Sequence, residues 1–594
     1  MLKKFFLNVL SSFMGAWIAI VVSGLCIFMI LMGIIGIFAG KNVAIRNNSV
    51  LKINLQGELI ERESASEMTV LSLMQNSPLS FQTVETLVDA IEEAKENSDI
   101  KAIYLDCGAL AAAPASANTV RNALLDFKKK GKKIYAYGDQ YSQASYYIAT
   151  CTDELYVNPL GSINLHGLGG ENLFYKGLFD KIGLEFQVVK VGEGKSAVEP
   201  YTQEHMSEYA KNQTMELIDT IWNGFSAQMA SSRGISSALL DSLINKDIPQ
   251  LRDGNFALSN KLVKGTIYRH ELEQRIADEA GMPDGLEYLV TPSDAAAFRA
   301  MTLPANGNNE IAVLYACGGI DTDFGGNGIN SQSLVSEIIK LGKNDKVNGL
   351  VLRVNSPGGS AYGSEQIWEA LEWFKKQGKP VAVSMGDYAA SGGYYISCGA
   401  DRIFADRFTI TGSIGIFGLI PNIKGLMDKV GVNAEMVATN PEAQIFSLME
   451  PMNAHQLESL QAMVDSGYNV FVNRCAKGRN IPVDSIKQIA DGRPIAATVA
   501  LRYKLVDQIG SLNDAVNWTA NKANLKGDYN IGVYPVIQPN LLMQLFTSQN
   551  VSLPPAVESY LIQSNWNSWM INSLKNVLAA DKLRAELPAF KLKL

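Results

Sequence analysis

LVDAIEEAKENSDIKAIYL at Leu87–Leu105 and LVSEIIKLGKNDKVNGLVL at Leu334–Leu352 decide the fold, because the second stretch echoes the first. The offset between them is 247 residues and stays constant from the first position to the last. In each stretch, apolar residues at helical spacing precede a polar turn and a short apolar run. This pattern predicts a helix that leads into a buried strand, present twice.

The repeat extends beyond this pair of stretches. Three further blocks keep a similar offset: Tyr146–Ile148 with Tyr394–Ile396, Gly161–Ile163 with Gly412–Ile414, and Leu178–Gly183 with Leu426–Gly431. A repeat period of about 250 residues indicates a duplicated domain rather than a solenoid. A chain of 594 residues also exceeds the size of one hydrophobic core, so at least two domains are expected.

Within each copy, short apolar runs alternate with helical stretches, as at Ile311–Tyr315, Leu350–Val354 and Pro380–Ser384. Nearly continuous apolar strands separated by helices predict an α/β fold whose sheet is buried on both faces. We expect four parts along the chain. These are an N-terminal stub with a membrane anchor at 1–45, a first domain with a helical connector at 46–300, a second domain at 301–535, and a C-terminal helical tail at 536–594.

The amino terminus has the composition of a membrane anchor. The 36 positions between Lys4 and Lys41 carry no charge, and residues 14–39 are almost continuously apolar. About 20 apolar residues span a bilayer, whereas the apolar core of a cleaved signal peptide has about 7–15. We expect one uncleaved transmembrane helix, in contact with lipid at 14–39, and the rest of the chain in water on one side. Basic residues flank the span at both ends, so charge does not choose its orientation.

Composition excludes several functional classes. The net charge is −7 and the basic residues are scattered, so we expect no nucleic-acid partner. The six cysteines show no CxxC pair, and the four histidines lie far apart. We therefore expect no disulfide framework, no metal site and no cofactor.

We place the chemistry in Asp387–Ser397, DYAASGGYYIS. Ser391 stands between two alanines and two glycines, so the backbone of a reactant can approach it closely. A small-residue helix start packed under a sheet would give the same pattern. Comparison of the two copies separates these interpretations, since aligning Tyr146 with Tyr394 puts Gln143 opposite Ser391. The first copy therefore lacks the hydroxyl.

A lysine shows the opposite pattern. Aligning Glu199-Pro200 with Glu450-Pro451 puts Lys195 opposite Phe446, to within a residue or two, so the second copy lacks the amine. Most lysines in glycine-rich turns are solvated surface charges, and only this complementary loss distinguishes Lys195. Each copy has kept one polar group and lost the other, as expected of a composite site shared by two specialised domains.

This pair of groups fits nucleophilic catalysis. A serine hydroxyl is a weak nucleophile and needs an adjacent base. A lysine can serve as that base only when neutral, so its pKa of about 10.4 must fall towards about 7–8. Burial among apolar neighbours can supply such a shift.

The turn Ser356–Ser360 supplies candidates for an oxyanion hole. It follows an apolar strand, precedes a helix and contains Gly358 and Gly359. Bare backbone N–H groups there can bind developing negative charge together with the N–H of Gly392. The matching stretch of the first copy, 106–114, has one glycine. A tight turn without a catalytic role is the alternative.

These motifs together resemble the long, two-domain signal peptide peptidases of bacteria, the protease IV type. The resemblance covers roughly residues 50–530 and the anchor, and rests on Lys195–Pro200, Ser356–Gly359, Ala390–Tyr395 and Thr411–Phe417. It implies tandem ClpP/crotonase-like domains preceded by one transmembrane helix. The tail beyond residue 530 matches no feature of that family.

The resemblance also implies roles for individual residues. Ser391 would be the nucleophile, Lys195 the general base, and Gly358 or Gly359 with Gly392 the oxyanion hole. The implied protein is a serine endopeptidase anchored in the inner membrane of a bacterium, with its catalytic part on the periplasmic side. It would degrade cleaved signal peptides and other hydrophobic peptides, and it would assemble into a homotetramer.

Two other functions stay open. An acyl-thioester enzyme of the crotonase type would use the oxyanion amides without a serine nucleophile, and a catalytically inactive scaffold would use only the anchor and the tail. Ser413 and Ser162 occupy matching Gly-Ser-Ile turns and are second-best nucleophiles that look structural because both copies have them. Ser413 can instead orient Lys195 by a hydrogen bond.

Overall fold

The computed structural model describes residues 45–62, 81–282, 284–302, 307–322, 328–536 and 583–586. The predicted anchor at 14–39 lies outside these residues, as does most of the predicted C-terminal tail. Among the helices that are described, none has the length and hydropathy that a bilayer crossing needs. The anchor therefore stays a prediction.

The first copy of the repeat is built on a seven-stranded sheet in the order β2-β1-β3-β4-β5-β7, with β8 also paired to β1. All of these pairs are parallel. Consecutive residues of one strand point to opposite faces, and Ile103 and Tyr104 of β3 belong to different core clusters. Both faces of the sheet are therefore buried. The strands are β1 (Ser49–Ile60), β2 (Phe81–Thr83), β3 (Ile100–Ala112), β4 (Lys133–Tyr141), β5 (Glu154–Ile163), β7 (Gly265–Thr266) and β8 (Leu289–Val290).

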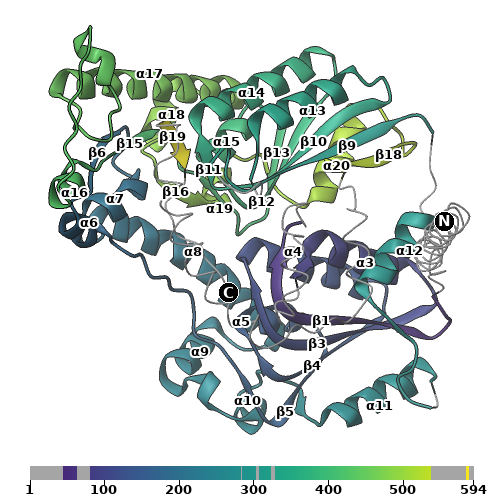
Figure 1. Ribbon diagram of the computed structural model, residues 1–594. Coiled ribbons are helices and arrows are strands. Elements are labelled where there is room, and N and C mark those ends of the chain that lie inside the picture. Colours follow the sequence, from purple (N-terminus) through teal and green to yellow (C-terminus); the bar gives the residue numbers. More distant parts are fainter. Residues whose placement is uncertain are drawn as a thin grey trace, which may run out of the picture.

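Helices cover both faces of this sheet (Figure 1). They are α3 (Val84–Glu96), α4 (Pro114–Lys128), α5 (Gln143–Ala149), α8 (Glu208–Arg233), α9 (Ser237–Ser242), α10 (Gly254–Ser259), α11 (Arg269–Ala280) and α12 (Pro292–Thr302). Two further helices of the first copy, α6 (Lys176–Ile182) and α7 (Glu199–Thr202), lie away from this sheet (Figure 1). The predicted helix of the repeat is α3, whose N-cap Thr83 accepts a hydrogen bond from the N–H of Thr86. It buries Leu87 and Ile91 against the sheet and leads into β3.

The second copy repeats this arrangement on an eight-stranded sheet in the order β16-β14-β12-β10-β9-β18, with β13 joining β12 to β17. Its strands are β9 (Glu310–Cys317), β10 (Val347–Ser356), β12 (Val381–Ala390), β13 (Arg402–Ala405), β14 (Ile410–Gly412), β16 (Pro494–Ala496), β17 (Gln508–Ile509) and β18 (Asn530–Tyr534). Its helices are α13 (Ser331–Lys343), α14 (Ala361–Lys376), α15 (Gly392–Ser397), α16 (Lys424–Lys429), α17 (Ala454–Arg479), α18 (Val483–Ile489), α19 (Ala497–Arg502) and α20 (Leu512–Lys522). The predicted α/β class and its duplication are confirmed.

The helix-rich segment 201–300, which the sequence predicts as a connector, has counterparts throughout the second copy. The helices α8 and α17 both have 26 residues, and α10, β7 and α11 recur as α19, β17 and α20. This segment is therefore the second half of the first copy. The sequence repeat is weak in this segment, because α8 and α17 differ at most of their positions.

A small antiparallel sheet joins the copies. Its order is β11-β19-β15-β6, with β6 (Glu185–Lys190) from the first copy and β11 (Gly358–Ser360) and β15 (Phe417–Asn422) from the second. The remaining strand, β19 (Leu583–Glu586), comes from the end of the chain. Because β6 pairs with β15 along six residues, the segment that follows β6 is carried onto the second copy.

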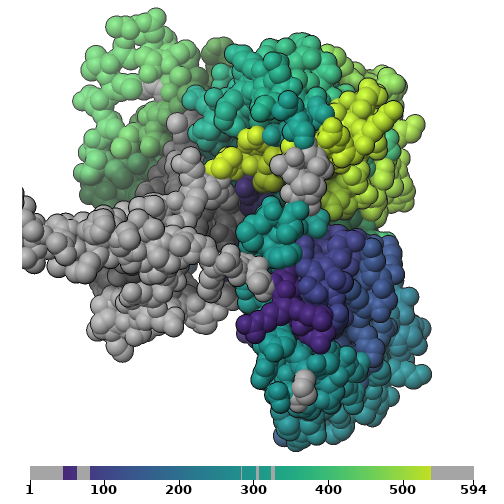
Figure 2. Space-filling view, turned by 90° about the vertical axis from the view of Figure 1, so that its right-hand side faces the viewer, coloured from purple at the N-terminus to yellow at the C-terminus, as the bar shows by residue number. Residues whose placement is uncertain are grey.

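The two large sheets lie one above the other, with α4 of the first copy against β12 of the second (Figure 1). Figure 2 shows the same division from the side, with the purple and blue residues of the first copy below the yellow-green end of the second. Between the copies, the guanidinium of Arg353 donates to both carboxylate oxygens of Glu61, at 2.8 and 3.0 Å. Nearby, Ser116 donates its N–H and its hydroxyl to Asp387, at 2.8 and 2.6 Å.

We predict that the buried Arg353–Glu61 pair holds the copies together. In the Arg353→Met variant, Glu61 is left as an uncompensated buried carboxylate, which costs about 3–5 kcal/mol. We expect a marked drop in the Tm of the detergent-solubilised protein, and a smaller combined loss in the Arg353→Met/Glu61→Gln double variant than the sum of the two single losses. Lys376→Met, which removes an exposed ion pair with Glu369, is the control and should cost less than about 1 kcal/mol. Equal melting temperatures for Arg353→Met and Lys376→Met would contradict the prediction.

Candidate active site

Ser391 lies at a sharp turn between the last residue of β12 and the first residue of α15. Its φ of 55° and ψ of −114° are unusual for a residue with a side chain, and such strain costs about 1–3 kcal/mol. Two hydrogen bonds of 2.8 Å hold the turn, from the Ser391 N–H to the Gly412 carbonyl and from the Tyr395 N–H to the Ser391 carbonyl. A Cβ at Gly393 would lie 2.6 Å from the Ser356 carbonyl oxygen, which explains the second glycine of the motif.

Lys195 approaches the same turn from the first copy. It follows β6 and precedes a short 3₁₀ helix at Ser196–Val198. The N–H of Gly194 donates to the Asp491 carbonyl at 2.8 Å, and a Cβ at Gly192 would lie 2.3 Å from that same oxygen. The glycines around Lys195 therefore let its loop lie directly on the second copy.

The structure brings Lys195 and Ser391 together. The Lys195 Nζ lies 2.7 Å from the Ser391 Oγ, although the two residues are 196 positions apart. The Nζ also lies 3.1 Å from the Ser413 Oγ and 3.2 Å from the Ser413 carbonyl oxygen, and the Ser413 hydroxyl donates to the Gly492 carbonyl at 2.9 Å. All three side chains are 0 % exposed, and burial disfavours the ammonium form of a lysine.

This arrangement has the geometry of an activated nucleophile. A base must lie within about 2.6–3.2 Å of the hydroxyl whose proton it takes, and a neutral amine at 2.7 Å satisfies that requirement. The hydroxyl and carbonyl of Ser413 fix the direction in which the amine points.

The predicted oxyanion glycines flank Ser391. Gly392 is the first residue of α15, and β11, which contains Gly358 and Gly359, packs against that helix. The N–H of Gly358 donates to the Ser356 Oγ at 3.1 Å. The backbone of β11 bonds Ile320 through the Gly358 carbonyl and the Ser360 N–H, so the N–H of Gly359 points to the opposite side, where β19 lies. Of the two glycines, Gly359 is thus the better donor to a bound reactant.

The strand β19 fills a slot beside Ser391. It pairs antiparallel with β11 through Gly358–Ser360 and with β15 through Phe417 and Gly418. It also contacts α15, the helix that begins at the nucleophile turn. The slot between β11 and β15 therefore accepts an extended peptide with backbone pairing on both sides.

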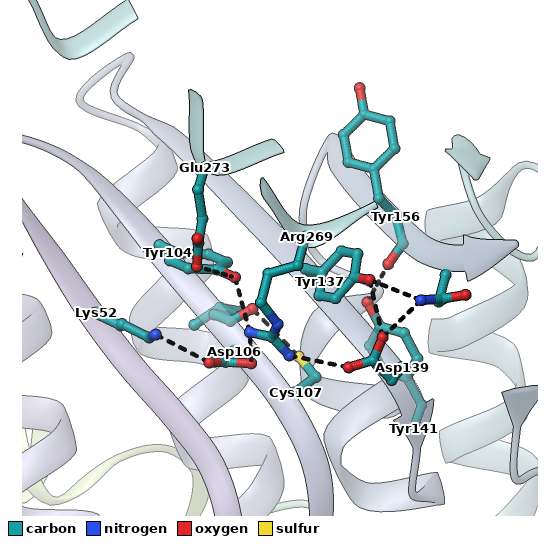
Figure 3. Close-up of polar contacts among 12 residues, drawn as sticks. Lys52, Tyr104, Asp106, Cys107, Tyr137, Asp139, Tyr141, Tyr156, Arg269 and Glu273 are labelled. Atoms are coloured by element: carbon teal, nitrogen blue, oxygen red, sulfur yellow. Dashed lines mark hydrogen bonds and ion pairs between the residues drawn. The ribbon is translucent and has the colours of Figure 1, made fainter. Parts of the chain in front are cut away.

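The corresponding end of the first sheet has a different construction. Arg269 of α11 donates to Asp106 at 2.7 Å and to Asp139 at 3.3 Å, as Figure 3 shows. Burial opposes ionisation of Asp139, yet hydrogen bonds from Tyr137, Asn158 and Arg269 lower its pKa. Ion pairs thus occupy the end of this sheet.

In the first copy, the counterparts of the candidate site residues are other residue types or form hydrogen bonds to the backbone. Gln143, aligned with Ser391, accepts from the N–H groups of His166 and Gly167 and donates to the Gly167 carbonyl. The N-cap of α5 is Ser142, with an ordinary φ of −71°, and its hydroxyl is bound to the backbone of Leu110. Ser162 lies in β5, in register with Gln140. Tyr146 and Tyr394 bond equivalent leucine carbonyls, at Leu262 and Leu505, which agrees with the alignment of Gln143 with Ser391. The helix of the first copy begins one residue earlier than that of the second.

Sequence reasoning also missed the loop Asp491–Arg493. The Asp491 carbonyl accepts from the N–H of Gly194, and the Arg493 carbonyl accepts from the N–H of Ser413. The Gly492 carbonyl accepts from the Ser413 hydroxyl, which contacts Lys195. The Asp-Gly dipeptide marks a turn, but nothing local indicates that this turn meets a segment about 300 residues earlier.

Comparisons with known proteins agree with this geometry. The chain is 33 % identical to Protease 4 of Haemophilus influenzae over 540 residues, 88 % of this chain and 86 % of that protein. It is 30 % identical to Protease 4 of Salmonella typhi over 561 residues, 90 % of this chain and 89 % of that protein. It is 27 % identical to the chloroplastic serine protease SPPA of Arabidopsis thaliana over 515 residues, 85 % of this chain and 73 % of that protein.

Among solved structures, ClpP1 from Listeria monocytogenes matches with a TM-score of 0.22 and 15 % identity, over 34 % of this chain and 94 % of that one. The model of peptidase family S49 matches residues 126–282 and 373–526, one segment in each copy of the repeat. The chain is therefore a member of peptidase family S49, a family of serine endopeptidases.

Proposed function

We propose that this peptidase works through a Ser391–Lys195 dyad assembled from both copies of the repeat. The observation that carries the proposal is the 2.7 Å contact between the two buried side chains. Lys195 takes the proton of the Ser391 hydroxyl as its Oγ attacks the carbonyl of the scissile peptide bond. The amine then returns this proton to the leaving nitrogen, and an acyl-enzyme ester is left on Ser391. Water, deprotonated by the same amine, hydrolyses the ester.

Backbone amides stabilise the charge that develops in this reaction. The N–H groups of Gly359 and Gly392 flank the Ser391 turn, and they would bind the oxyanion of the tetrahedral intermediate. Gly358 supports them by shaping the turn, because its φ of 106° is one that residues with a side chain rarely adopt. An acyl-thioester enzyme would use the same amides, but it would not explain a buried lysine in contact with a serine hydroxyl.

The substrate is an extended peptide. The slot that β19 fills offers backbone partners on two sides, which recognise a main chain whatever its sequence. Backbone pairing of this kind does not require polar side chains on the peptide, so the slot can take hydrophobic peptides. Together with the likeness to signal peptide peptidases, this favours cleaved signal peptides as substrates. The predicted anchor at 14–39 would hold the enzyme in the inner membrane, where such peptides are left behind.

Loss of the base should abolish turnover while the nucleophile stays in place. We expect Lys195→Ala to lower kcat by about 10²–10⁴-fold, the usual contribution of a general base, and Ser391→Ala to prevent labelling by a fluorophosphonate probe. Activity of the wild type should fall as pH falls, because protonation of Lys195 removes the base, and the residual activity of Lys195→Ala should lack that step. Lys190→Ala, in the neighbouring strand, is the control. Full activity of Lys195→Ala near neutral pH, or of Ser391→Ala, would refute the dyad.

Ser413 should act by orienting Lys195. We expect Ser413→Ala to lower kcat by about fivefold and to leave KM unchanged, because one hydrogen bond of about 1 kcal/mol to the amine is lost. The matched control is Ser162→Ala, its counterpart in the first copy. Peptidase assays on both variants measure the difference, and an unchanged kcat in Ser413→Ala would show that its hydroxyl has no part in the reaction.

The carboxyl-terminal strand should compete with substrate. Ala585→Pro removes a backbone N–H from the strand paired with Gly359, and deletion of 583–594 removes the strand. If β19 fills the slot for nine-tenths of the time, both changes lower KM by about tenfold and leave kcat unchanged. A shorter deletion, of 588–594, leaves the strand in place and is the control. Steady-state kinetics with a hydrophobic peptide test this, and an unchanged KM in both variants would show that β19 does not lie in the substrate path.

A further inference from the structure

A pocket of about 620 Å³ lies where the two copies meet, apart from the catalytic turn. The first copy lines it with α4 and α8, including Arg121, Gln228 and Ser232. The second copy contributes Arg407 and Phe408, between β13 and β14, and Thr498 of α19. None of its lining residues is acidic, whereas two are arginines.

Arg121 is the buried charge of this pocket. Its side chain donates to the Tyr147 carbonyl at 3.0 Å, the Thr150 hydroxyl at 2.9 Å and the Ser232 hydroxyl at 2.6 Å. All three acceptors are neutral, although the residue is only 2 % exposed. Its Nε is buried and finds no acceptor among the residues that the structure describes. A buried guanidinium is costly unless an anion compensates its charge.

Arg407 adds a second positive charge at the rim. Its guanidinium lies over the Phe408 ring at 5.4 Å and forms no ion pair within the described part of the chain. The adjacent acid, Asp406, accepts instead from the Asn118 side chain at 2.6 Å and from the Phe408 N–H at 2.9 Å. Burial raises the pKa of Asp406 to about 6, and its hydrogen bonds are with Asn118 and Phe408 rather than with either arginine.

We propose that this pocket binds a phosphate-type oxyanion, held by Arg121 and Arg407 and by the hydroxyls around them. Guanidinium groups recognise phosphate oxygens with paired N–H donors, and Ser231, Ser232 and Thr498 supply hydroxyl donors in the same lining. A volume of about 620 Å³ exceeds what a bare phosphate needs, so the anion can be free or can be part of a larger molecule such as a lipid headgroup.

Such a ligand would bridge the copies that share the dyad. It would contact α4 and α8 on one side and the 406–408 turn and α19 on the other. A ligand that binds only the assembled copies stabilises them by mass action, so its binding raises the Tm. The site is therefore expected to connect the phosphate content of the surroundings with the integrity of the catalytic centre.

The test is a titration of the full-length, detergent-solubilised protein with inorganic phosphate, followed by calorimetry and by thermal unfolding. A parallel arm uses a short-chain phosphatidylglycerol, with phosphatidylcholine of equal chain length as its control, and sodium chloride at matched ionic strength controls for screening. Saturable heat and a rising Tm with inorganic phosphate identify the free anion as ligand. A response to phosphatidylglycerol alone identifies a headgroup. No saturable response in either arm overturns the proposal.

Substitutions locate the response in the pocket. Because Arg121 is buried and its replacement can unfold the chain, the informative variants are Arg407→Gln and Thr498→Val, with Arg502→Gln on the exposed end of α19 as the matched control. We expect Arg407→Gln to raise the Kd about tenfold, which corresponds to about 1.4 kcal/mol, and Arg502→Gln to leave it unchanged. Labelling of Ser391 by a fluorophosphonate in each variant verifies that the protein is folded. Equal Kd values for Arg407→Gln and Arg502→Gln would show that the anion binds elsewhere and would end the proposal.

Discussion

The contact between Lys195 and Ser391 makes the proposed reaction centre depend on how the two copies of the repeat fit together. The two atoms lie 2.7 Å apart, and each is delivered by a different copy. A shift of about 1 Å between the copies would break that hydrogen bond, and catalytic geometry tolerates little more than this. The contacts that fix the copies are therefore as necessary to the chemistry as the two side chains themselves.

Three kinds of contact supply this fit. Backbone pairing of β6 with β15 sets the register of the segment that leads to Lys195. Glycines at 192 and 194 let that segment pack against the Asp491 carbonyl, and the hydrogen bond from Gly194 to this carbonyl fixes the backbone next to Lys195. The polar contacts of Arg353 with Glu61 and of Ser116 with Asp387 fix the strands beneath the nucleophile. Apolar packing also joins the copies, as at Phe225 and Phe408, and the directional bonds add one satisfied arrangement to it.

The fold and the two main candidate residues could be predicted from the sequence, whereas the contacts between distant segments could not, for a physical reason. The duplication, the helix–strand units and the candidates Ser391 and Lys195 all follow from local patterns and from comparing two copies. The pairing of β6 with β15 and the loop at Asp491 involve segments far apart in the chain, and local periodicity carries no information about them. The earlier start of α5, at Gln143, could not be predicted either, because it depends on the backbone of the turn, which is strained at Ser391 and ordinary in the first copy. The ion pairs of Arg269 with Asp106 and Asp139 could not be predicted either, because these residues are also far apart in the chain.

The divergence of the copies also explains why the slot that β19 fills, which we propose as the substrate site, lies in the second one. The strands β11 and β15 each present backbone groups to the space between them, and unpaired edges of this kind bind any extended chain that reaches them. In the first copy, the residues that follow β5, 164–175, form no strand, and Gln143 bonds the backbone at 166–167. A peptide would thus find two receptive edges only beside Ser391. The backbone groups that bind the chain's own strand at 583–586 are the ones that we propose to bind substrate. Occupancy by β19 and the proposed recognition of a peptide whatever its sequence would therefore have the same physical origin, backbone pairing at a strand edge.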